Sequence, residues 1–246
     1  MQILERTKKI KNWISSYCKS MPKEASTLVI GISGGIDSSV TSTLCALTGK
    51  KTIVLSMPIK QIKEQHDLSL KHQEWLKNKF KNVEGYTIKL DEVFSSFKKS
   101  LSNFENDHGM ANSRARLRMT SLYQVAAANN GVVVGTGNKV EDFGVGFYTK
   151  YGDGGVDISP IADCTKTQVW EMGKSLGIIK EILDAEPTDG LWEDGRTDIK
   201  QLGMSYEELE EAMKDKNSKG HSKYLEIRKR NLHKMKPIPV CMMDDE

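Results

Sequence analysis

The residue types best suited to chemistry stand together in one short stretch, Ser33-Gly-Gly-Ile-Asp-Ser-Ser39. Backbone N–H groups at a turn that opens a helix point toward one spot, and the helix dipole adds partial positive charge there. Glycine at positions 34 and 35 permits positive φ and removes the Cβ atoms that would block an anion. The three serines can add hydroxyl donors. The stretch therefore predicts a binding site for a phosphate or pyrophosphate group.

Asp37 is the unexpected member of this stretch, because a carboxylate repels a polyphosphate. A bridging Mg²⁺ removes that repulsion, since magnesium is commonly held by one or two carboxylates together with phosphate oxygens. The stretch lacks the Gly-Lys-Ser/Thr ending of a Walker A loop, which excludes that class of phosphate site. An ordinary glycine turn followed by a helix cap is the alternative interpretation.

The elements around this stretch predict a parallel sheet. An apolar run rich in β-branched residues at 27–31 predicts a buried strand, and a helix with a capped start is expected over 38–48. Further strands are expected at 52–56, 83–89 and 132–135. The helices expected between these strands span 62–80, 91–101 and 112–130, the last capped by Asn112. Strands that alternate with helices of this length imply right-handed crossovers and a doubly wound α/β fold.

The loops at 31–38 and 136–141 both leave strands at the carboxyl edge of this sheet, where ligands of such folds bind. We therefore expect the two loops to meet. The first 20 residues form an amphipathic helix by their apolar spacing, whereas 137–160 is glycine-rich and expected to be mostly irregular. The stretch 186–202 has no periodicity and is the candidate for a mobile lid. The other expected helices span 166–176, 179–185, 205–215 and 218–233.

Composition limits the remaining classes of function. With 246 residues, 38% hydrophobic and 28% charged, the chain is expected to be a single domain over 1–246. No apolar run approaches about 18 residues and the N-terminus does not read as a signal peptide, so no membrane partner is expected. Four dispersed cysteines without a CxxC pair favour reduced thiols and a cytoplasmic location. The net charge of +3 is too small to argue for nucleic acid as a partner.

The Ser-Gly-Gly-x-Asp-Ser pattern resembles the pyrophosphate loop of the ATP pyrophosphatase superfamily, whose members split ATP into AMP and pyrophosphate. Four later motifs follow it in the order Asn-Ser-Arg-Ala-Arg-Leu-Arg-Met at 112–119, Gly-Thr-Gly-Asn-Lys-Val-Glu at 135–141, Thr-Lys-Tyr-Gly-Asp-Gly-Gly-Val-Asp at 149–157 and Leu-His-Lys-Met-Lys-Pro at 232–237. Together these motifs resemble those of ammonia-dependent NAD synthetases over nearly the whole chain. The run at 149–157 is the most specific of them.

The resemblance implies a homodimer with a Rossmann-like, doubly wound sheet of the adenine nucleotide α-hydrolase type. It also implies a reaction in which MgATP adenylates the nicotinate carboxylate of deamido-NAD and pyrophosphate leaves. Ammonia then displaces AMP to give NAD. Glutamine-using relatives carry a large amidase domain, for which this chain has no room, so free ammonia or a separate partner is the expected nitrogen donor.

Particular residues of the chain are suited to the steps of this reaction. The amides of 31–38 can stabilise charge on the departing pyrophosphate, and Lys166 can add a point charge that arginine would replace poorly. Asp37 and Glu141 are expected to hold Mg²⁺ between ATP oxygens. Thr136 is placed to hydrogen-bond ATP, and the resemblance adds Thr188. The full expected ATP set is Gly31, Ile32, Ser33, Gly34, Gly35, Ile36, Asp37, Ser38, Thr136, Lys166 and Thr188.

For deamido-NAD the resemblance implies a separate set of contacts, namely Arg116, Lys150, Asp157, His233 and Lys234. Arg114 and Arg118 share one helical face, about 200° from Arg116, and either a solvated face or a ligand role fits them. Our hypothesis for Asp153 is that its carboxylate attracts ammonium and helps deliver ammonia to the adenylate. A turn aspartate is the alternative.

The chain also departs from the family pattern. Ser56 stands where a basic residue is usual before the second strand ends, and Ile199 and Gln201 replace common acids after the candidate lid. These departures weaken any transfer of adenine contacts, including one to Gln61. Two rival functions are a tRNA-modifying or thiolating ATP pyrophosphatase and a nucleotide-binding sensor without catalysis. Low net charge and the isolated Cys164 argue against the first, and the set Asp37, Glu141 and Lys166 argues against the second.

Overall fold

The protein folds around a parallel sheet of strand order β3-β2-β1-β4. Its structure, a computed structural model, describes residues 2–188, 190–192 and 194–243. The strands are β1 (Thr27–Gly31), β2 (Lys51–Ser56), β3 (Val83–Thr87) and β4 (Gly131–Val133). Val29 of β1 lies in register with Ile53 on one side and with Val133 on the other. The predicted strands and their parallel pairing are confirmed.

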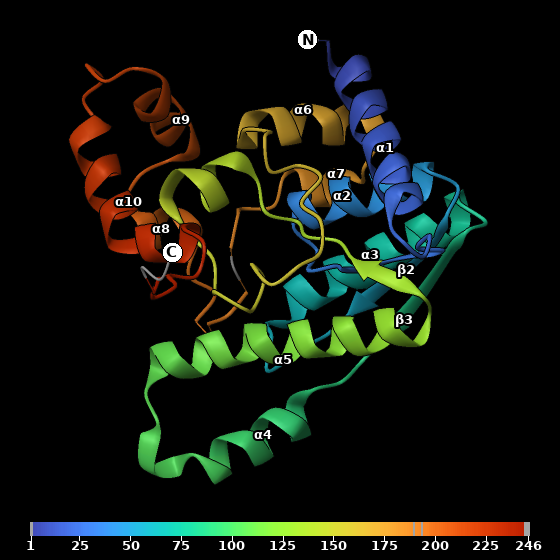
Figure 1. The fold of residues 1–246 in the computed structure, drawn as a ribbon, viewed down its shortest axis with the longest axis horizontal. Helices are drawn as coiled ribbons and strands as arrows, with labels where there is room; N and C mark the ends of the chain where they lie inside the picture. The colour runs from blue at the N-terminus through green and yellow to red at the C-terminus, as the bar shows by residue number, and fades with distance from the viewer. Residues whose placement is uncertain (1, 189, 193, 244–246) are drawn as a thin grey trace.

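Helices cover both faces of the sheet, because alternate residues of each strand point to opposite sides (Figure 1). Leu28 and Ile30 pack in a cluster with α1 (Ile3–Ser20), α2 (Ile36–Leu47) and α6 (Lys166–Leu176). Val29 belongs to a second cluster formed with α4 (Asp91–Ser100) and α5 (Asp107–Ala128). Helices α3 (Lys63–Lys79) and α7 (Lys180–Leu183) complete the first face. The doubly wound arrangement predicted from the alternation is therefore present.

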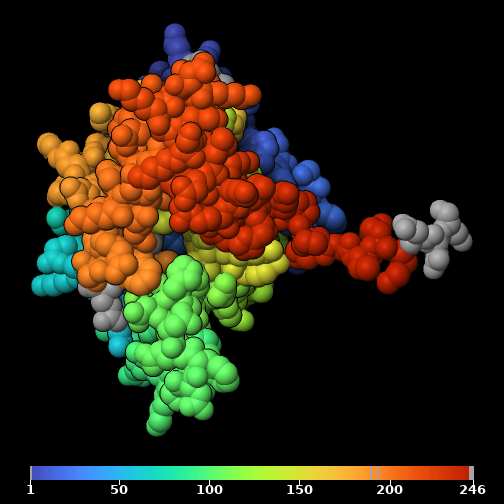
Figure 2. All heavy atoms as spheres, turned by 90° about the vertical axis from the view of Figure 1, so that its left-hand side faces the viewer, coloured from blue at the N-terminus to red at the C-terminus, as the bar shows by residue number. Residues whose placement is uncertain are grey.

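A third apolar cluster lies beside the sheet and is built from the last quarter of the chain. It joins α8 (Asp198–Leu202), α9 (Tyr206–Lys214) and α10 (His221–Met235) to the π-helix η2 (Lys139–Val145). The C-terminal helices form one orange-to-red mass from which the red C-terminal tail projects outward (Figure 2). The described residues include no helix long and apolar enough to cross a lipid bilayer.

Three local predictions are wrong, each for a capping or turn reason. Helix α5 begins at Asp107, because the capping residue is Asn106 and not Asn112: Asn106 accepts a hydrogen bond from Gly109 N at 2.7 Å. A short 3-10 helix, η1 (Ser102–Phe104), precedes α5. Helix α2 begins at Ile36 after Gly35, with no side-chain cap. Residues 139–145 are helical rather than irregular, since Asn138 Oδ1 accepts from the N–H groups of Val140 and Glu141.

Candidate active site

Two loops meet at the carboxyl edge of the sheet, as the strand order requires. The loop after β1 leads into Asp37 at the start of α2, and the loop after β4 leads through Asn138 into η2. Asn138 Nδ2 donates a hydrogen bond to Asp37 Oδ1 at 3.1 Å, and Asn138 is fully buried. The predicted meeting is confirmed. The sequence reasoning missed Asn138, whose only signal was a capping residue ahead of Glu141.

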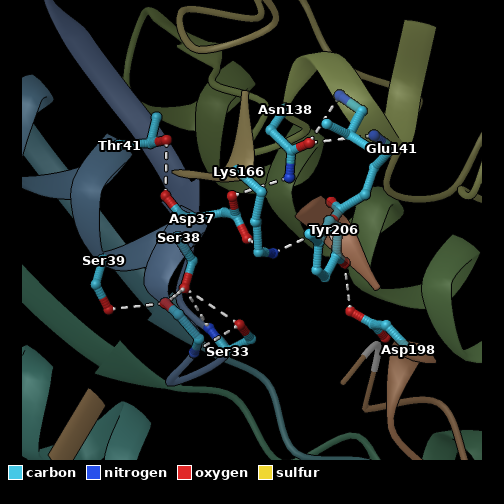
Figure 3. A network of polar contacts seen from close by, with 12 residues as sticks. Ser33, Asp37, Ser38, Ser39, Thr41, Asn138, Glu141, Lys166, Asp198 and Tyr206 are labelled. Atoms are coloured by element: carbon cyan, nitrogen blue, oxygen red, sulfur yellow. Dashed lines mark hydrogen bonds and ion pairs between the residues drawn. The ribbon is translucent and has the colours of Figure 1, made fainter. Parts of the chain in front are cut away.

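Lys166, the first residue of α6, joins the two loops electrostatically (Figure 3). Its Nζ lies 2.5 Å from Asp37 Oδ2 and 2.9 Å from Glu141 Oε1, and the residue is only 2% exposed. Burial opposes the charged ammonium, but the two carboxylates outweigh burial and raise the pKa of Lys166 above its ordinary value. Burial raises the pKa of Asp37 above its ordinary value. Burial also acts to raise the pKa of Glu141, but the positive charge of Lys166 outweighs burial there, and the pKa of Glu141 is lowered.

The donor set of this cluster fits magnesium. Asp37 lies at the start of α2 and Glu141 lies in η2, yet one ammonium contacts both carboxylates, so their oxygens converge on a single point. The described residues contain no group of three or more His, Cys, Asp and Glu side chains suited to a metal. A site with two carboxylates suits an ion that takes its remaining ligands from phosphate oxygens and water, as Mg²⁺ does.

The loop at 31–38, which we call the phosphate loop because it is predicted to bind phosphate, depends on the backbone conformation of Gly34. Gly34 has a φ of +88°, and a Cβ atom there would lie 2.8 Å from both Gln65 O and Ser69 N of α3. Gly35 has a φ of −84°, so of the two glycines that permit positive φ only Gly34 uses it. Ser38 Oγ donates to Gly35 O at 3.0 Å and accepts from Ser33 N at 3.2 Å, which fixes the loop from within.

A cleft at this edge brings together the residues predicted to contact ATP. Its lining includes every residue from 31 to 38, together with Thr136, Glu141, Lys166 and Thr188. Thr188 Oγ1 donates to Arg196 O at 3.1 Å, inside the 186–202 segment. That segment was predicted as an aperiodic lid, but Asp198–Leu202 forms the helix α8; its residues 189 and 193 lie outside the described residues.

The residues assigned by resemblance to deamido-NAD do not line this cleft where the chain is described. Arg116 is exposed and donates to Lys150 O at 3.2 Å. The Asp157 carboxylate accepts from Tyr123 Oη at 3.0 Å and from Val133 N at 2.7 Å, so it braces β4. The last two members of the set, His233 and Lys234, lie in α10. Nothing among these contacts tests a role in ligand binding.

The other two arginines of the trio point elsewhere. Arg114 is 8% exposed and its Nη1 donates to Leu191 O at 2.5 Å, so a solvated face is wrong for Arg114. Arg118 Nε donates to Met57 O at 2.9 Å and lines the cleft. The buried guanidinium of Arg114 thus ties α5 to the segment 186–202.

Two acids near the cleft behave differently from each other. Asp153 is exposed, lines the cleft and accepts a hydrogen bond from Thr149 N at 2.9 Å, as a turn aspartate does. Its role toward ammonium stays a prediction. Asp142 also lines the cleft, and the sequence reasoning missed it because a polar residue after Glu141 carries no positional signal. Burial, reinforced by the charge of Glu141, raises the pKa of Asp142 well above its ordinary value.

Tyr206 is a further residue that the sequence reasoning did not find. Its hydroxyl lies 2.5 Å from Glu141 Oε1 and 2.7 Å from Asp198 Oδ2, and its ring lies 4.5 Å from Lys166 Nζ (Figure 3). A tyrosine at the start of a polar helix gives no hint of such contacts in sequence. Only the packing of α9 against η2 brings it to the cluster.

The fold is a doubly wound α/β fold of the adenine nucleotide α-hydrolase type, with a glycine-containing loop between its first strand and α2. The NAD synthase family profile matches residues 6–243, and the chain belongs to this family. Over 211 residues it is 37% identical to the NH₃-dependent NAD⁺ synthetase of Carboxydothermus hydrogenoformans, with 84% of this chain and 83% of that protein covered.

Two solved structures extend the comparison over nearly the whole chain. The NMN synthetase from Francisella tularensis superposes with a TM-score of 0.90 at 35% identity, covering 99% of this chain and 100% of that one. The NH₃-dependent NAD synthetase from Campylobacter jejuni superposes with a TM-score of 0.79 at 26% identity, covering 98% and 100%. The predicted family and fold class are confirmed.

Proposed function

We propose that the protein is an ammonia-dependent NAD synthetase, a ligase that forms a C–N bond. The nicotinate carboxylate of deamido-NAD attacks the α-phosphorus of ATP, and pyrophosphate leaves. Ammonia then attacks the acyl carbon, AMP leaves, and NAD remains. The observation that carries this proposal is the convergence of Asp37, Glu141 and Lys166 beside a phosphate loop in a chain of the NAD synthase family.

Within this proposal the cleft binds ATP. The amides of 31–38 and the Lys166 ammonium would face the β- and γ-phosphates, where charge grows as pyrophosphate departs. Asp37 and Glu141 would hold Mg²⁺, which supplies positive charge between phosphate oxygens when bound. Thr136 and Thr188, which line the same cleft, would hydrogen-bond the nucleotide.

The second substrate would bring its nicotinate carboxylate to the α-phosphorus of ATP and would be held by residues that do not line the ATP cleft. Arg116, Lys150, Asp157, His233 and Lys234 would contact deamido-NAD, and Asp153 would attract ammonium at the mouth of the cleft. We also propose a homodimer, a cytoplasmic location, and neither nucleic acid nor membrane as a partner. The reduced state expected of the cysteines supports the cytoplasmic location, and the small net charge argues against nucleic acid. The lack of an apolar run of about 18 residues argues against a membrane partner.

A second candidate is the same amidation carried out on nicotinate mononucleotide, giving nicotinamide mononucleotide. The observation that favours it is the superposition on the NMN synthetase from Francisella tularensis, with a TM-score of 0.90 against 0.79 for the Campylobacter jejuni enzyme. Both candidates need the same ATP cleft and the same nicotinate carboxylate. They differ only in whether the substrate carries an AMP half.

One experiment separates the two candidates. The purified protein is incubated with ATP, Mg²⁺ and ammonium chloride plus either deamido-NAD or nicotinate mononucleotide, and AMP, pyrophosphate and the amidated product are quantified. A higher kcat/KM with deamido-NAD supports the first candidate, and a higher value with the mononucleotide supports the second. ATP cleavage on another acceptor, or ATP binding without turnover, would overturn both.

A further inference from the structure

The hydroxyl of Tyr206 lies between two carboxylates that belong to different parts of the fold. Glu141 Oε1 is 2.5 Å away on η2, and Asp198 Oδ2 is 2.7 Å away at the first residue of α8. Tyr206 is 2% exposed and Asp198 is 4% exposed, so water has little access to this contact. A phenol carries one proton and can donate it to only one carboxylate at a time.

Asp198 also joins the two ends of the segment 186–202 through a backbone hydrogen bond. Its backbone N–H donates to Pro187 O at 3.0 Å, directly beside Thr188. Thr188 lines the ATP cleft, as do Pro187 and Asp198 themselves. The position of Asp198 is therefore coupled to the position of the part of this segment that faces ATP.

Glu141 has a competing partner of its own. Lys166 Nζ contacts the same Oε1 atom at 2.9 Å, and Glu141 is one of the two carboxylates that fit Mg²⁺. A carboxylate whose charge is already neutralised by a cation attracts a phenol proton less strongly. Lys166 alone leaves both contacts of the Tyr206 hydroxyl in place, at 2.5 Å to Glu141 Oε1 and 2.7 Å to Asp198 Oδ2. A metal cation added at Glu141 would shift the proton of Tyr206 toward Asp198.

We propose that Tyr206 is a positioning residue that couples the metal carboxylate Glu141 to the segment 186–202 through Asp198. The inference rests on the proposed function, because it takes Glu141 as a ligand of the ATP-bound cation. Cation binding at Glu141 strengthens the hydrogen bond that fixes Asp198, and a fixed Asp198 leaves Glu141 free for the cation. Linkage makes this coupling reciprocal.

Tyr206→Phe is the variant that isolates the hydroxyl. It keeps the ring that packs edge-on against Trp170 and faces the Lys166 ammonium, and it removes only the O–H group. Tyr224→Phe is the matched control, since Tyr224 lies in the same apolar cluster and is 8% exposed but makes neither carboxylate contact.

Two measurements test the coupling without relying on turnover. Hydrogen exchange of 186–202 is followed by mass spectrometry with a non-hydrolysable ATP analogue, with and without Mg²⁺, and the Mg²⁺ dependence of analogue binding is titrated calorimetrically. In the wild type and in Tyr224→Phe, Mg²⁺ with the analogue should slow exchange in this segment. In Tyr206→Phe the slowing should disappear, and the Mg²⁺ requirement should fall by up to about tenfold, because Glu141 loses the hydrogen-bond donor that competes with the cation.

The inference would be overturned if Tyr206→Phe kept the wild-type Mg²⁺ dependence of analogue binding and the wild-type protection of 186–202 from exchange. It would also be overturned if Tyr224→Phe changed both quantities as much as Tyr206→Phe does. If the wild type shows no Mg²⁺-dependent binding of the analogue, the proposed function fails first, which distinguishes the two failures. If Tyr206→Phe does not fold, Asp198→Asn tests the same link, because a neutral amide competes less for the phenol proton. Unchanged loop protection in that variant would then overturn the inference.

Discussion

Lys166 carries a buried charge that is paired with two carboxylates. It is buried, and its ammonium sits between Asp37 and Glu141, which would repel each other without it. Such an arrangement contributes little net stability as a pair, but removal of one partner leaves uncompensated charge in a low dielectric. The cluster therefore adds little to stability when it is intact, which fits the role toward MgATP that we propose for it.

Lys166→Met should lower the free energy of unfolding by about 3 kcal/mol, because two buried carboxylates lose their shared counter-charge. Urea denaturation measures the change, and added Mg²⁺ should restore part of it by taking the place of the ammonium. Lys180→Met is the control, since its ion pair with Asp184 is exposed and should change stability by less than about 1 kcal/mol. Equal losses in the two variants would contradict the expectation.

Asp153→Asn should slow the ammonia step more than pyrophosphate release. Asp153 is exposed and lines the cleft, and electrostatic attraction can raise the local concentration of a cation by roughly tenfold or more. Rapid-quench assays that follow pyrophosphate and amidated product separately measure both steps. An equal loss in both would refute the ammonium role and leave Asp153 as a turn residue that accepts from Thr149 N.

At the scale of elements, the phosphate loop packs against the backbone of α3 at Gly34, where a Cβ atom has no room. Gly34→Ala should therefore lower the free energy of unfolding more than Gly49→Ala. Both glycines have positive φ, which costs a residue with a Cβ atom about 1 kcal/mol or more, but only Gly34 meets α3 backbone, whereas Gly49 has open space around it. Denaturation of both variants and calorimetric ATP binding of each provide the measurement. Retained MgATP binding in Gly34→Ala would show that the loop geometry is not needed.

The contact of α2 with α3 predicts a pH dependence. His72 is fully buried on α3, with Nε2 at 2.9 Å from Ser42 Oγ of α2, and burial lowers the pKa of His72 from 6.5 to about 4. The imidazole of His72 therefore binds a proton more tightly in the unfolded chain than in the folded protein. The contribution of neutral His72 is therefore complete above pH 6.5 and is lost as the pH falls toward 4, by about 3 kcal/mol in total.

Unfolding free energies measured between pH 7 and 4 check this expectation. His72→Gln should flatten the pH dependence of stability in that window, whatever its effect on the absolute value at neutral pH. His108→Gln, at an exposed position of α5, is the control and should leave the wild-type slope in place. An unchanged slope in His72→Gln would show that His72 titrates alike in the folded and unfolded states.

At the scale of the whole molecule, the proposed homodimer is directly measurable. Light scattering at micromolar concentration should give twice the 27.6 kDa mass of one chain. The expectation derives from the family, and the exposure of Arg116 on α5 leaves that residue available to a ligand or to a second copy. A monomer in the presence of both substrates would contradict the expectation.

The sequence by itself determined the sheet and the phosphate loop. Strand runs such as 27–31 and the glycine turn after it are local patterns, and parallel strands separated by helices have few ways to fold. That is why the meeting of Asp37 and Glu141 at one edge could be predicted. Helix starts were less certain, since Asn106 and Asn112 are equally good caps and only the structure shows that Asn106 accepts the bond.

Tertiary structure alone decided which distant side chains complete the cluster. Asn138 and Tyr206 reach it because η2, α6 and α9 pack together, and no periodicity encodes a contact between residues so far apart in sequence. The same holds for Arg114, for which the sequence left a solvated face and a ligand role open and which the structure buries against Leu191. Local sequence fixes backbone dihedrals and apolar faces, whereas the partners of a buried polar group depend on which faces finally meet.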